Sequence, residues 1–321
     1  MAANDVPNPR YDGSTLSLGF GCGDLFGGQS FVSSVKLIET ALDCGITHFD
    51  TARLYGNGSA ETVLGKVLPH VRNRVTITTK VGILPWRMRH AERIKRKAAR
   101  IIQLMGGRRF IQEPSRPDAQ FGAFALRDLK RSLHRSLKEL NTDYVDILLL
   151  HECTLDHASR PDVLEFLLRA RERGQIREFG IATSIQHTQS ILSVCPNVAS
   201  IIQVPHDVLG APLPFATKGF MIVHSIVKGA LPRISAYLNS DPTIASLWKE
   251  ETGVNPRDKN AIAKLLLASA VRNVPRGLVL FSTTKCDRIR AMAASVRNCE
   301  VASSQLQGLD RAVSRIKASG D

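Results

Sequence analysis

Several features that mark other classes of protein are absent from this sequence. Its 321 residues contain no apolar run of about eighteen residues, the length that a membrane-spanning helix needs, so we expect no membrane span. Residues 1–10 are polar and carry no apolar signal core. The six cysteines show no metal-type spacing, which favours reduced thiols and no metal site. The remaining composition, 43% hydrophobic and 22% charged, is globular, and we expect a cytoplasmic protein.

The glycine motif of dinucleotide-binding Rossmann domains is also absent. Gly19-Phe-Gly-Cys-Gly is the nearest approach to G-x-G-x-x-G, and it lacks the final spacing. The sequence therefore argues against an open Rossmann sheet.

The charge of the chain is strongly unbalanced, but most of the excess is local. The formal net charge is +14, and residues 86–116 alone supply eight of these charges, with ten basic and two acidic side chains. Apart from Trp86 and Phe110 this segment has no aromatic side chains on which bases could stack. We therefore expect no nucleic-acid partner.

Apolar runs and helical patterns alternate along the chain with the rhythm of a parallel α/β barrel. Strands are expected at residues 16–20, 46–49, 75–80, 144–150, 178–182, 200–204, 220–224 and 278–281. Helices are expected at residues 35–42, 61–71, 126–140, 163–173, 188–194, 260–271, 288–296 and 304–317. No clear helix is predicted between Val208 and Lys218, because Pro212 and Pro214 oppose one. The pattern predicts a single (β/α)8 barrel domain over residues 1–321, with a basic insertion after strand three, at about 83–122.

The most informative stretch of the sequence is residues 45–61. A short apolar strand is followed at once by Asp50 and Tyr55, and then by the turn Gly56-Asn-Gly-Ser. Ser59 is predicted to cap the next helix, with Glu61 in its first turn. Because ligands of α/β barrels bind at the carboxyl ends of the strands, the carboxylate and the phenol are candidates for chemistry.

This stretch resembles the Asp-Thr-Ala…Tyr-Gly signature of the aldo-keto reductases, and the resemblance runs from about Thr15 to Asn298. It implies a (β/α)8 barrel, a nicotinamide cofactor and a catalytic set of Asp50, Tyr55, Lys80 and His151. Tyr55 would transfer the proton, and Lys80 would lower its pKa, since an ammonium favours the phenolate. Asp50 would be the counter-ion of Lys80, and His151 would bind the carbonyl oxygen. A purely structural Asp50–Lys80 ion pair is the alternative, but it leaves Tyr55 unexplained.

The resemblance also implies where the cofactor binds. Thr183, Ser184 and Gln203 would hold the carboxamide, and His224 would replace the aromatic ring that stacks on nicotinamide. The phosphates would lie at the segment between strand eight and its helix, where hydroxyls and a helix N-terminus meet; ordinary capping by Thr284 is the alternative. Lys285 and Arg288 suit a 2′-phosphate, so NADP is expected, with NAD possible. The full set of expected cofactor residues is Gly21, Cys22, Asp50, Thr183, Ser184, Gln203, His224, Ser225, Ser282, Thr283, Thr284, Lys285 and Arg288.

We therefore expect an NADP-dependent oxidoreductase that acts on a small carbonyl or alcohol substrate. An NAD-dependent aldose dehydrogenase and a non-catalytic regulatory subunit of the same family are the alternatives. In the insertion, Ile94, Ala98, Ile101 and Met105 share one helical face with basic residues around it. This segment is either a basic lid over the catalytic rim or a solvated basic face.

Overall fold

The computed structural model describes residues 17–25, 30–85, 119–213 and 219–319. Its strands form a closed parallel barrel in chain order, which confirms the expected (β/α)8 architecture. All eight strands fall within a few residues of their predicted positions. They are β1 (Leu18–Gly21), β2 (His48–Asp50), β3 (Thr76–Val81), β4 (Val145–His151), β5 (Ile176–Ala182), β6 (Ile201–Pro205), β7 (Phe220–His224) and β8 (Leu278–Phe281).

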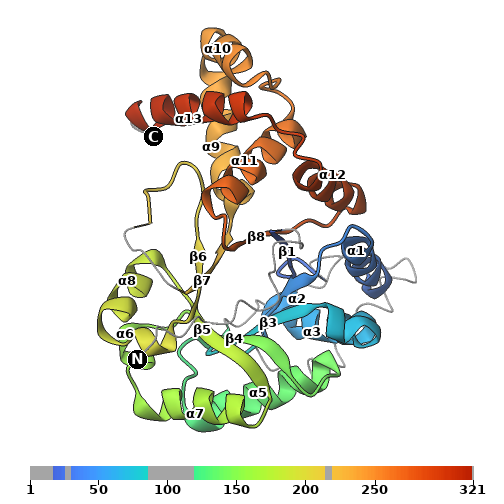
Figure 1. The fold of residues 1–321 in the computed structure, drawn as a ribbon, viewed down its shortest axis with the longest axis vertical. Coiled ribbons are helices and arrows are strands. Elements are labelled where there is room, and N and C mark those ends of the chain that lie inside the picture. Colours follow the sequence, from blue (N-terminus) through green and yellow to red (C-terminus); the bar gives the residue numbers. More distant parts are fainter. Residues whose placement is uncertain (1–16, 26–29, 86–118, 214–218, 320–321) are drawn as a thin grey trace, which may run out of the picture.

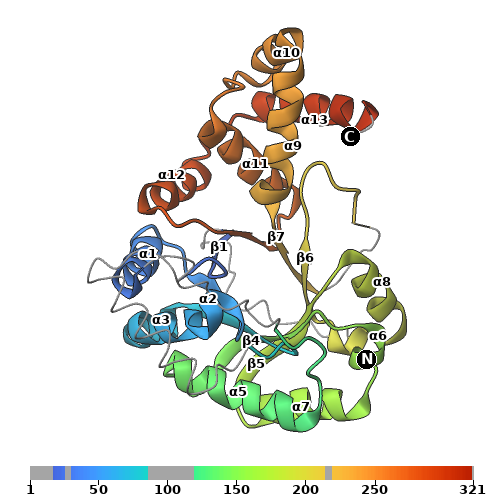
Figure 2. The same cartoon turned by 180° about the vertical axis from the view of Figure 1, so that it is seen from behind.

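Helices surround the barrel, and most of them begin and end near the predicted residues. The helices of the first half are α1 (Phe31–Asp43), α2 (Tyr55–Gly58), α3 (Ala60–Val67), the 3-10 helix η1 (Leu68–Arg74), α5 (Leu126–Leu140), α6 (Leu155–Ala158), α7 (Pro161–Glu172), α8 (Ile185–Val194) and the 3-10 helix η2 (Pro196–Val198). Those of the second half are α9 (Ile226–Ser240), α10 (Pro242–Thr252), α11 (Lys259–Asn273), α12 (Cys286–Arg297) and α13 (Ser303–Ala318). In Figure 1 and, from behind, in Figure 2, α9 to α13 gather at one end of the molecule, and α5 and α7 lie at the other.

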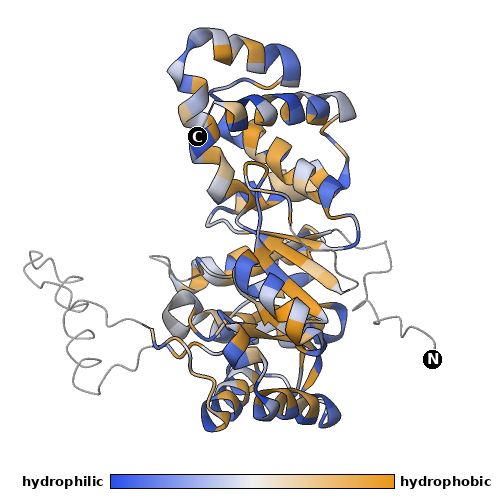
Figure 3. Ribbon diagram, turned by 90° about the vertical axis from the view of Figure 1, so that its left-hand side faces the viewer, coloured by the Kyte–Doolittle hydropathy of each residue, from blue (hydrophilic) through white to orange (hydrophobic). Residues whose placement is uncertain are grey.

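The apolar core has two parts, one on each side of the barrel wall. Inside the barrel, a small cluster includes Ile147, Leu149 and Ile222, and a larger cluster packs between the strands and the helices. Figure 3 shows this as largely hydrophobic strands in the middle and hydrophilic residues on the outer helix surfaces. Because side chains alternate along a strand, every second residue points inward, and the last inward positions face the open end of the barrel.

The structure differs from the sequence expectations in having additional helices and in one helix cap. Helices α9 and α10 were not predicted. Pro232 inside α9 opposes a helix, whereas Pro242 at the start of α10 and its cap Asp241 are helix-start signals that the sequence does contain. Ser59 does not cap α3: its backbone is helical, and its side chain makes no capping bond. As expected, no helix occurs between β6 and β7 among the residues described there.

The insertion is described only at its base. Leu84 and Gln120 form an isolated antiparallel bridge, with backbone N···O distances of 2.9 and 3.1 Å. The predicted helical face from Ile94 to Met105 lies outside the described residues. The choice between a basic lid and a solvated face therefore stays a prediction.

Candidate active site

A buried ion pair lies at the carboxyl ends of β2 and β3. Lys80 Nζ is 2.6 Å from Asp50 Oδ1 and also donates to the carbonyl oxygen of Thr51 at 3.0 Å. Both side chains are almost fully buried. Burial lowers the pKa of Lys80, but Asp50 and Tyr55 outweigh it, so the net pKa is raised. Lys80 is therefore an ammonium ion at neutral pH.

Tyr55 completes this cluster from the start of α2. Lys80 Nζ donates to the phenol oxygen at 3.2 Å, and the ring meets His151 edge-on with centroids 6.0 Å apart. Burial raises the pKa of Tyr55 above its ordinary value, and the lowering by Lys80 offsets only part of that rise. The net shift is opposite to the one predicted from the sequence. The phenol stays protonated at neutral pH, in the form that donates a proton.

The two histidines at this rim are neutral. Burial, together with the charge of Lys80, lowers the pKa of His151 to about 3 and that of His224 to about 4. His224 Nδ1 lies 2.9 Å from Ser225 Oγ. A neutral imidazole can donate one N–H to an oxygen atom, but it carries no extra proton to give away. His151 is thus suited to orienting a carbonyl rather than protonating it.

Gln203 joins the cluster from β6, but its predicted neighbours on β5 do not. Gln203 Nε2 donates to Asp50 Oδ2 at 2.7 Å. The last inward position of β5 is Ala182, which pairs in register with both His151 and Gln203. Thr183 is therefore turned away from this face, and its buried hydroxyl has no partner among the described residues. Ser184 caps α8 by accepting from His187 N.

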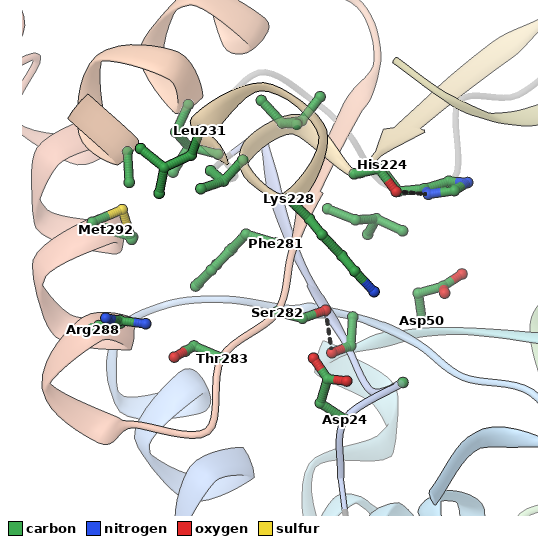
Figure 4. Close-up of a pocket in the computed structure, with 18 of the residues that line it drawn as sticks. Asp24, Asp50, His224, Lys228, Leu231, Phe281, Ser282, Thr283, Arg288 and Met292 are labelled. Carbon is green, nitrogen blue, oxygen red and sulfur yellow. Dashed lines mark hydrogen bonds between the residues drawn. The ribbon is translucent and has the colours of Figure 1, made fainter. Parts of the chain in front are cut away.

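A large cavity opens beside this cluster. It has a volume of about 990 Å³, within the range of small-molecule sites. Its polar end carries Asp50, Tyr55, Gln203 and His224, and it extends past Ser282 to α12 (Figure 4). Of the predicted site residues, those that line it are Gly21, Asp50, Tyr55, Gln203, His224, Ser225, Ser282, Thr283 and Arg288. The structure therefore brings most of the predicted cofactor residues to one cavity.

The cavity also has walls that the sequence did not reveal. Lys228 follows β7 and points from α9 into the cavity (Figure 4), and Lys259 lies at the start of α11. Together with the predicted Arg288 in the first turn of α12, they supply positive charge to the cavity. Apolar side chains form the wall between these cations: Leu231, Ala263, Leu267, Phe281 and Met292. The sequence placed the start of α11 within one residue, and Asp258 caps this helix, but no local signal pointed to Lys259 as a cavity residue.

Besides Thr183 and Ser184, five predicted residues lie outside this lining. Cys22 is fully buried, and burial raises the pKa of its thiol well above the usual value, so it is not a reactive thiolate. Lys80 and His151 do not line the cavity themselves but contact Tyr55, which does. Lys285 is exposed, and its N–H is 3.2 Å from Thr283 Oγ1. Thr284 faces a separate hollow between α1 and α12. No side chain caps the start of α12, so the alternative of capping by Thr284 is not observed.

The cavity fits the expected nicotinamide dinucleotide. Gly21 and Gly23 leave its floor free of side chains: a Cβ at Gly21 would meet Ser282 Oγ at 2.5 Å, and one at Gly23 would point into open space. Lys228, Lys259 and Arg288 lie in the first turns of three helices that line the cavity. Cations and helix N-termini are the groups that bind phosphates. The apolar wall ending at Met292 suits a flat base. In the part of the chain that the structure describes, no group of His, Cys, Asp or Glu could hold a metal ion.

Among these same residues, no helix combines the length and the apolar character that crossing a membrane requires.

A family model described as "Aldo/keto reductase family" matches residues 17–213. It therefore covers the cluster of Asp50, Tyr55, Lys80 and His151, whereas the cavity walls from α9, α11 and α12 lie beyond it. The chain is 27% identical over 223 residues to aldo-keto reductase YhdN of Bacillus subtilis, which is 64% of this chain and 54% of that protein. It spans about half the length of the curated relatives that it matches.

Solved structures show the same fold at lower identity. Aldo-keto reductase AKR11C1 from Bacillus halodurans, in a holo form, has a TM-score of 0.65 and 22% identity, over 92% of this chain and 91% of that one. An aldo-keto reductase from Klebsiella pneumoniae, solved in complex with NADPH, has a TM-score of 0.64 and 20% identity, over 92% and 90% of the two chains.

Proposed function

The chain belongs to the aldo/keto reductase family, and from this premise we propose that it is an NADP-dependent oxidoreductase that interconverts a carbonyl and an alcohol. The substrate is an aldehyde, a ketone or a sugar. One observation carries the proposal: the phenol of Tyr55 is hydrogen-bonded to a buried ammonium, Lys80, at the polar end of a cavity that fits a dinucleotide.

A bound cofactor would supply a hydride to the carbonyl carbon, and residues of this chain would transfer the proton. Tyr55 donates its proton to the carbonyl oxygen as negative charge develops there. Lys80, 3.2 Å from the phenol oxygen, stabilises the phenolate that remains. Asp50 fixes Lys80 through the 2.6 Å ion pair and keeps it charged. His151 donates a hydrogen bond that orients the carbonyl.

The same cavity residues would hold the cofactor. Gln203 and His224 lie next to Asp50, where the nicotinamide end would bind. Ser282 and Lys228 line the middle, and Arg288 and Met292 line the far end. The choice of NADP over NAD rests on Arg288, with support from the Klebsiella pneumoniae relative, which was solved with NADPH.

Replacing Tyr55 with phenylalanine tests the proposal. This change keeps the ring against His151 and removes the proton donor, so kcat for carbonyl reduction should fall about a hundred- to ten-thousand-fold. NADPH binding, followed by fluorescence, should persist, because the other cavity residues are intact. Tyr237→Phe, on α9 and outside the lining of the cavity, is the matched control and should keep full activity.

Three outcomes would contradict the proposal. Wild-type turnover by the Tyr55→Phe variant with cofactor bound would show that another group donates the proton. A wild-type protein that binds NADPH but turns over no aldehyde, ketone, sugar or alcohol would favour the regulatory subunit. Turnover of an aldose with NAD alone would favour the aldose dehydrogenase.

A further inference from the structure

A second buried charge network lies behind the catalytic cluster, on the outer side of the barrel wall. Arg53 Nη1 donates to Glu61 Oε2 at 2.5 Å and to Glu139 Oε2 at 2.7 Å. The other oxygen of Glu61, Oε1, accepts from Thr79 Oγ1 at 2.7 Å. Arg53 and Glu61 are 5% and 1% exposed, and Thr79 is fully buried. The catalytic scheme above uses none of these side chains.

This network joins the two chain segments that carry the proton donor and its ammonium. Arg53 stands between Asp50 and Tyr55 in the loop after β2, and Thr79 immediately precedes Lys80 in β3. Since neighbouring side chains of a strand point to opposite faces, Lys80 enters the barrel and Thr79 faces α3. Glu61, in the first turn of α3, thus receives one hydrogen bond from each segment.

The inner face of the same strand holds the same loop. Lys80 Nζ contacts Asp50 Oδ1, the carbonyl oxygen of Thr51 and the phenol oxygen of Tyr55, all within 3.2 Å. The loop from Asp50 to Tyr55 is therefore attached to β3 on both faces, by Lys80 inside and by Arg53, Glu61 and Thr79 outside. Glu139 of α5 fixes the guanidinium from a third element.

A contribution to the stability of the fold does not by itself explain this network. Burying an ion pair often gives no net stability, because desolvation offsets the Coulomb attraction. What a fully hydrogen-bonded buried network does provide is a fixed geometry. At this site geometry matters, because a displacement of about 1 Å in reacting groups can cost a hundredfold in rate.

We propose that Arg53, Glu61 and Thr79 form a positioning network that holds the Tyr55 phenol at hydrogen-bond distance from the Lys80 ammonium. The proposal rests on Tyr55 being the proton donor. None of the three touches substrate or cofactor, and they act through the loop and through β3. Losing one link lets the phenol move away from the ammonium, so the transition state loses stabilisation while cofactor binding is retained.

Thr79→Val is the decisive variant. It keeps the β-branched shape in the strand and removes the hydroxyl that donates to Glu61, which stays paired with Arg53. We expect kcat to fall about ten- to a hundredfold, with the Kd for NADPH and the KM for the carbonyl little changed. Thr79→Ser restores the hydroxyl and should recover most of kcat. Arg53→Lys, which keeps the charge but loses the fork of donors, should show the same split.

Thr142→Val is the matched control. Thr142 accepts a hydrogen bond from Arg72 in another ion-paired network, beside the starting ends of β3 and β4. Both threonine variants lose a hydroxyl from such a network, but only Thr79→Val should change kcat. Equal losses of kcat in the two variants, each tracking a fall in Tm, would reduce the role of Thr79 to stability and overturn the proposal.

A readout that needs neither cofactor nor substrate separates this proposal from the proposed function. The chain has four tyrosines, so ¹³Cζ-tyrosine labelling gives a simple NMR spectrum, and the Tyr55 signal is assigned by its absence in Tyr55→Phe. At neutral pH this signal should shift in Thr79→Val and keep its position in Thr142→Val. Neither substitution changes the residues that surround the ring, which are Lys80, Asp50, His151 and Cys22, so a shift reports a displacement of the phenol. An unmoved signal together with unchanged kcat would overturn the network alone. A shifted signal in a protein that turns over no carbonyl would overturn the proposed function alone.

Discussion

At the scale of single residues, Lys80 shows how burial and charge compete. Its ammonium is taken out of water, yet it contacts a carboxylate at 2.6 Å, a backbone carbonyl and a phenol. Charged groups in such sites are tolerated only when their partners replace the lost water. Asp50 and Tyr55 do so here, and the ammonium is then available to stabilise a phenolate.

Replacing Lys80 with methionine should lower kcat about as much as Tyr55→Phe, because the remaining phenol loses the charge that stabilises its anion. The double variant should be no worse than either single one, since the two residues act as one unit. Steady-state kinetics of the four proteins test this.

Lys66→Met, an exposed change on α3, is the control. If methionine leaves Asp50 unpaired and the protein unfolds, Asp50→Asn with Lys80→Met removes both charges. Fully additive losses would contradict the prediction.

Cofactor preference is a second prediction at the residue scale. The sequence favoured Lys285 and Arg288 together, but only Arg288 lines the cavity. Arg288→Ala should therefore weaken NADPH binding more than NADH binding, by about 1.5–3 kcal/mol for a lost charge-assisted bond. Lys285→Ala should have a smaller effect. Lys228→Ala should weaken both cofactors alike, because it lines the middle of the cavity. Fluorescence titrations with both cofactors measure this, and equal losses for Arg288→Ala would remove the reason for choosing NADP.

At the scale of elements, the packing of α3 against α5 places Glu61 and Glu139 on either side of Arg53. The two helices approach closely at Gly65, where a Cβ would overlap the carbonyl oxygen of Glu139. A side chain at this position would push the helices apart. The close approach of these two helices thus determines whether the guanidinium can reach both carboxylates.

Gly65→Ala is a stringent test of that contact. In an open helix this change would stabilise by up to about 1 kcal/mol, since alanine is the better helix former. Here overlap with backbone should instead destabilise the fold by about 1–3 kcal/mol. Urea unfolding measures the difference. Gly23→Ala, whose Cβ would meet nothing within 4 Å, should leave the free energy of unfolding nearly unchanged. A stabilised Gly65→Ala variant would show that α3 and α5 do not approach as closely as described.

At the scale of the whole molecule, buried neutral histidines make stability depend on pH. Burial lowers the pKa of His48 to about 4, of His151 to about 3 and of His224 to about 4, against an ordinary value of 6.5. Between these values and 6.5 the unfolded chain binds protons that the folded chain does not. Stability is therefore fully present above pH 6.5 and falls as the pH drops toward 4, by up to about 1.4 kcal/mol per pH unit for each histidine.

Urea midpoints from pH 7.5 down to 5 check this dependence. His224→Gln should flatten the slope, because one of the buried titrating groups is gone. His187→Gln, an exposed change on α8, is the control and should leave the slope as it is. An identical slope in all three proteins would mean that carboxylates alone cause the loss of stability.

The sequence by itself determined the barrel and the grouping of Asp50, Tyr55, Lys80 and His151 at one of its ends. Strand periodicity and the order of the elements are local signals, and they located all eight strands and the helix Leu126–Leu140. The segment from Asp50 to Tyr55, with Lys80 and His151 at the ends of later strands, was enough to predict one cluster. Parallel strands of a closed barrel end on the same rim, so residues at those ends must meet.

Tertiary structure decided what depends on distant segments. Helix α9 brings Lys228 into the cavity, whereas Ser184, predicted to bind cofactor, caps a helix because the inward position of β5 belongs to Ala182. The pKa of Tyr55 rises because burial raises it more than Lys80 lowers it, and the extent of burial depends on how distant segments pack around the ring. Arg53 and Glu139 are 86 positions apart in the chain. No local sequence pattern predicts this contact, because it forms only where α3 and α5 pack together on the outside of the barrel.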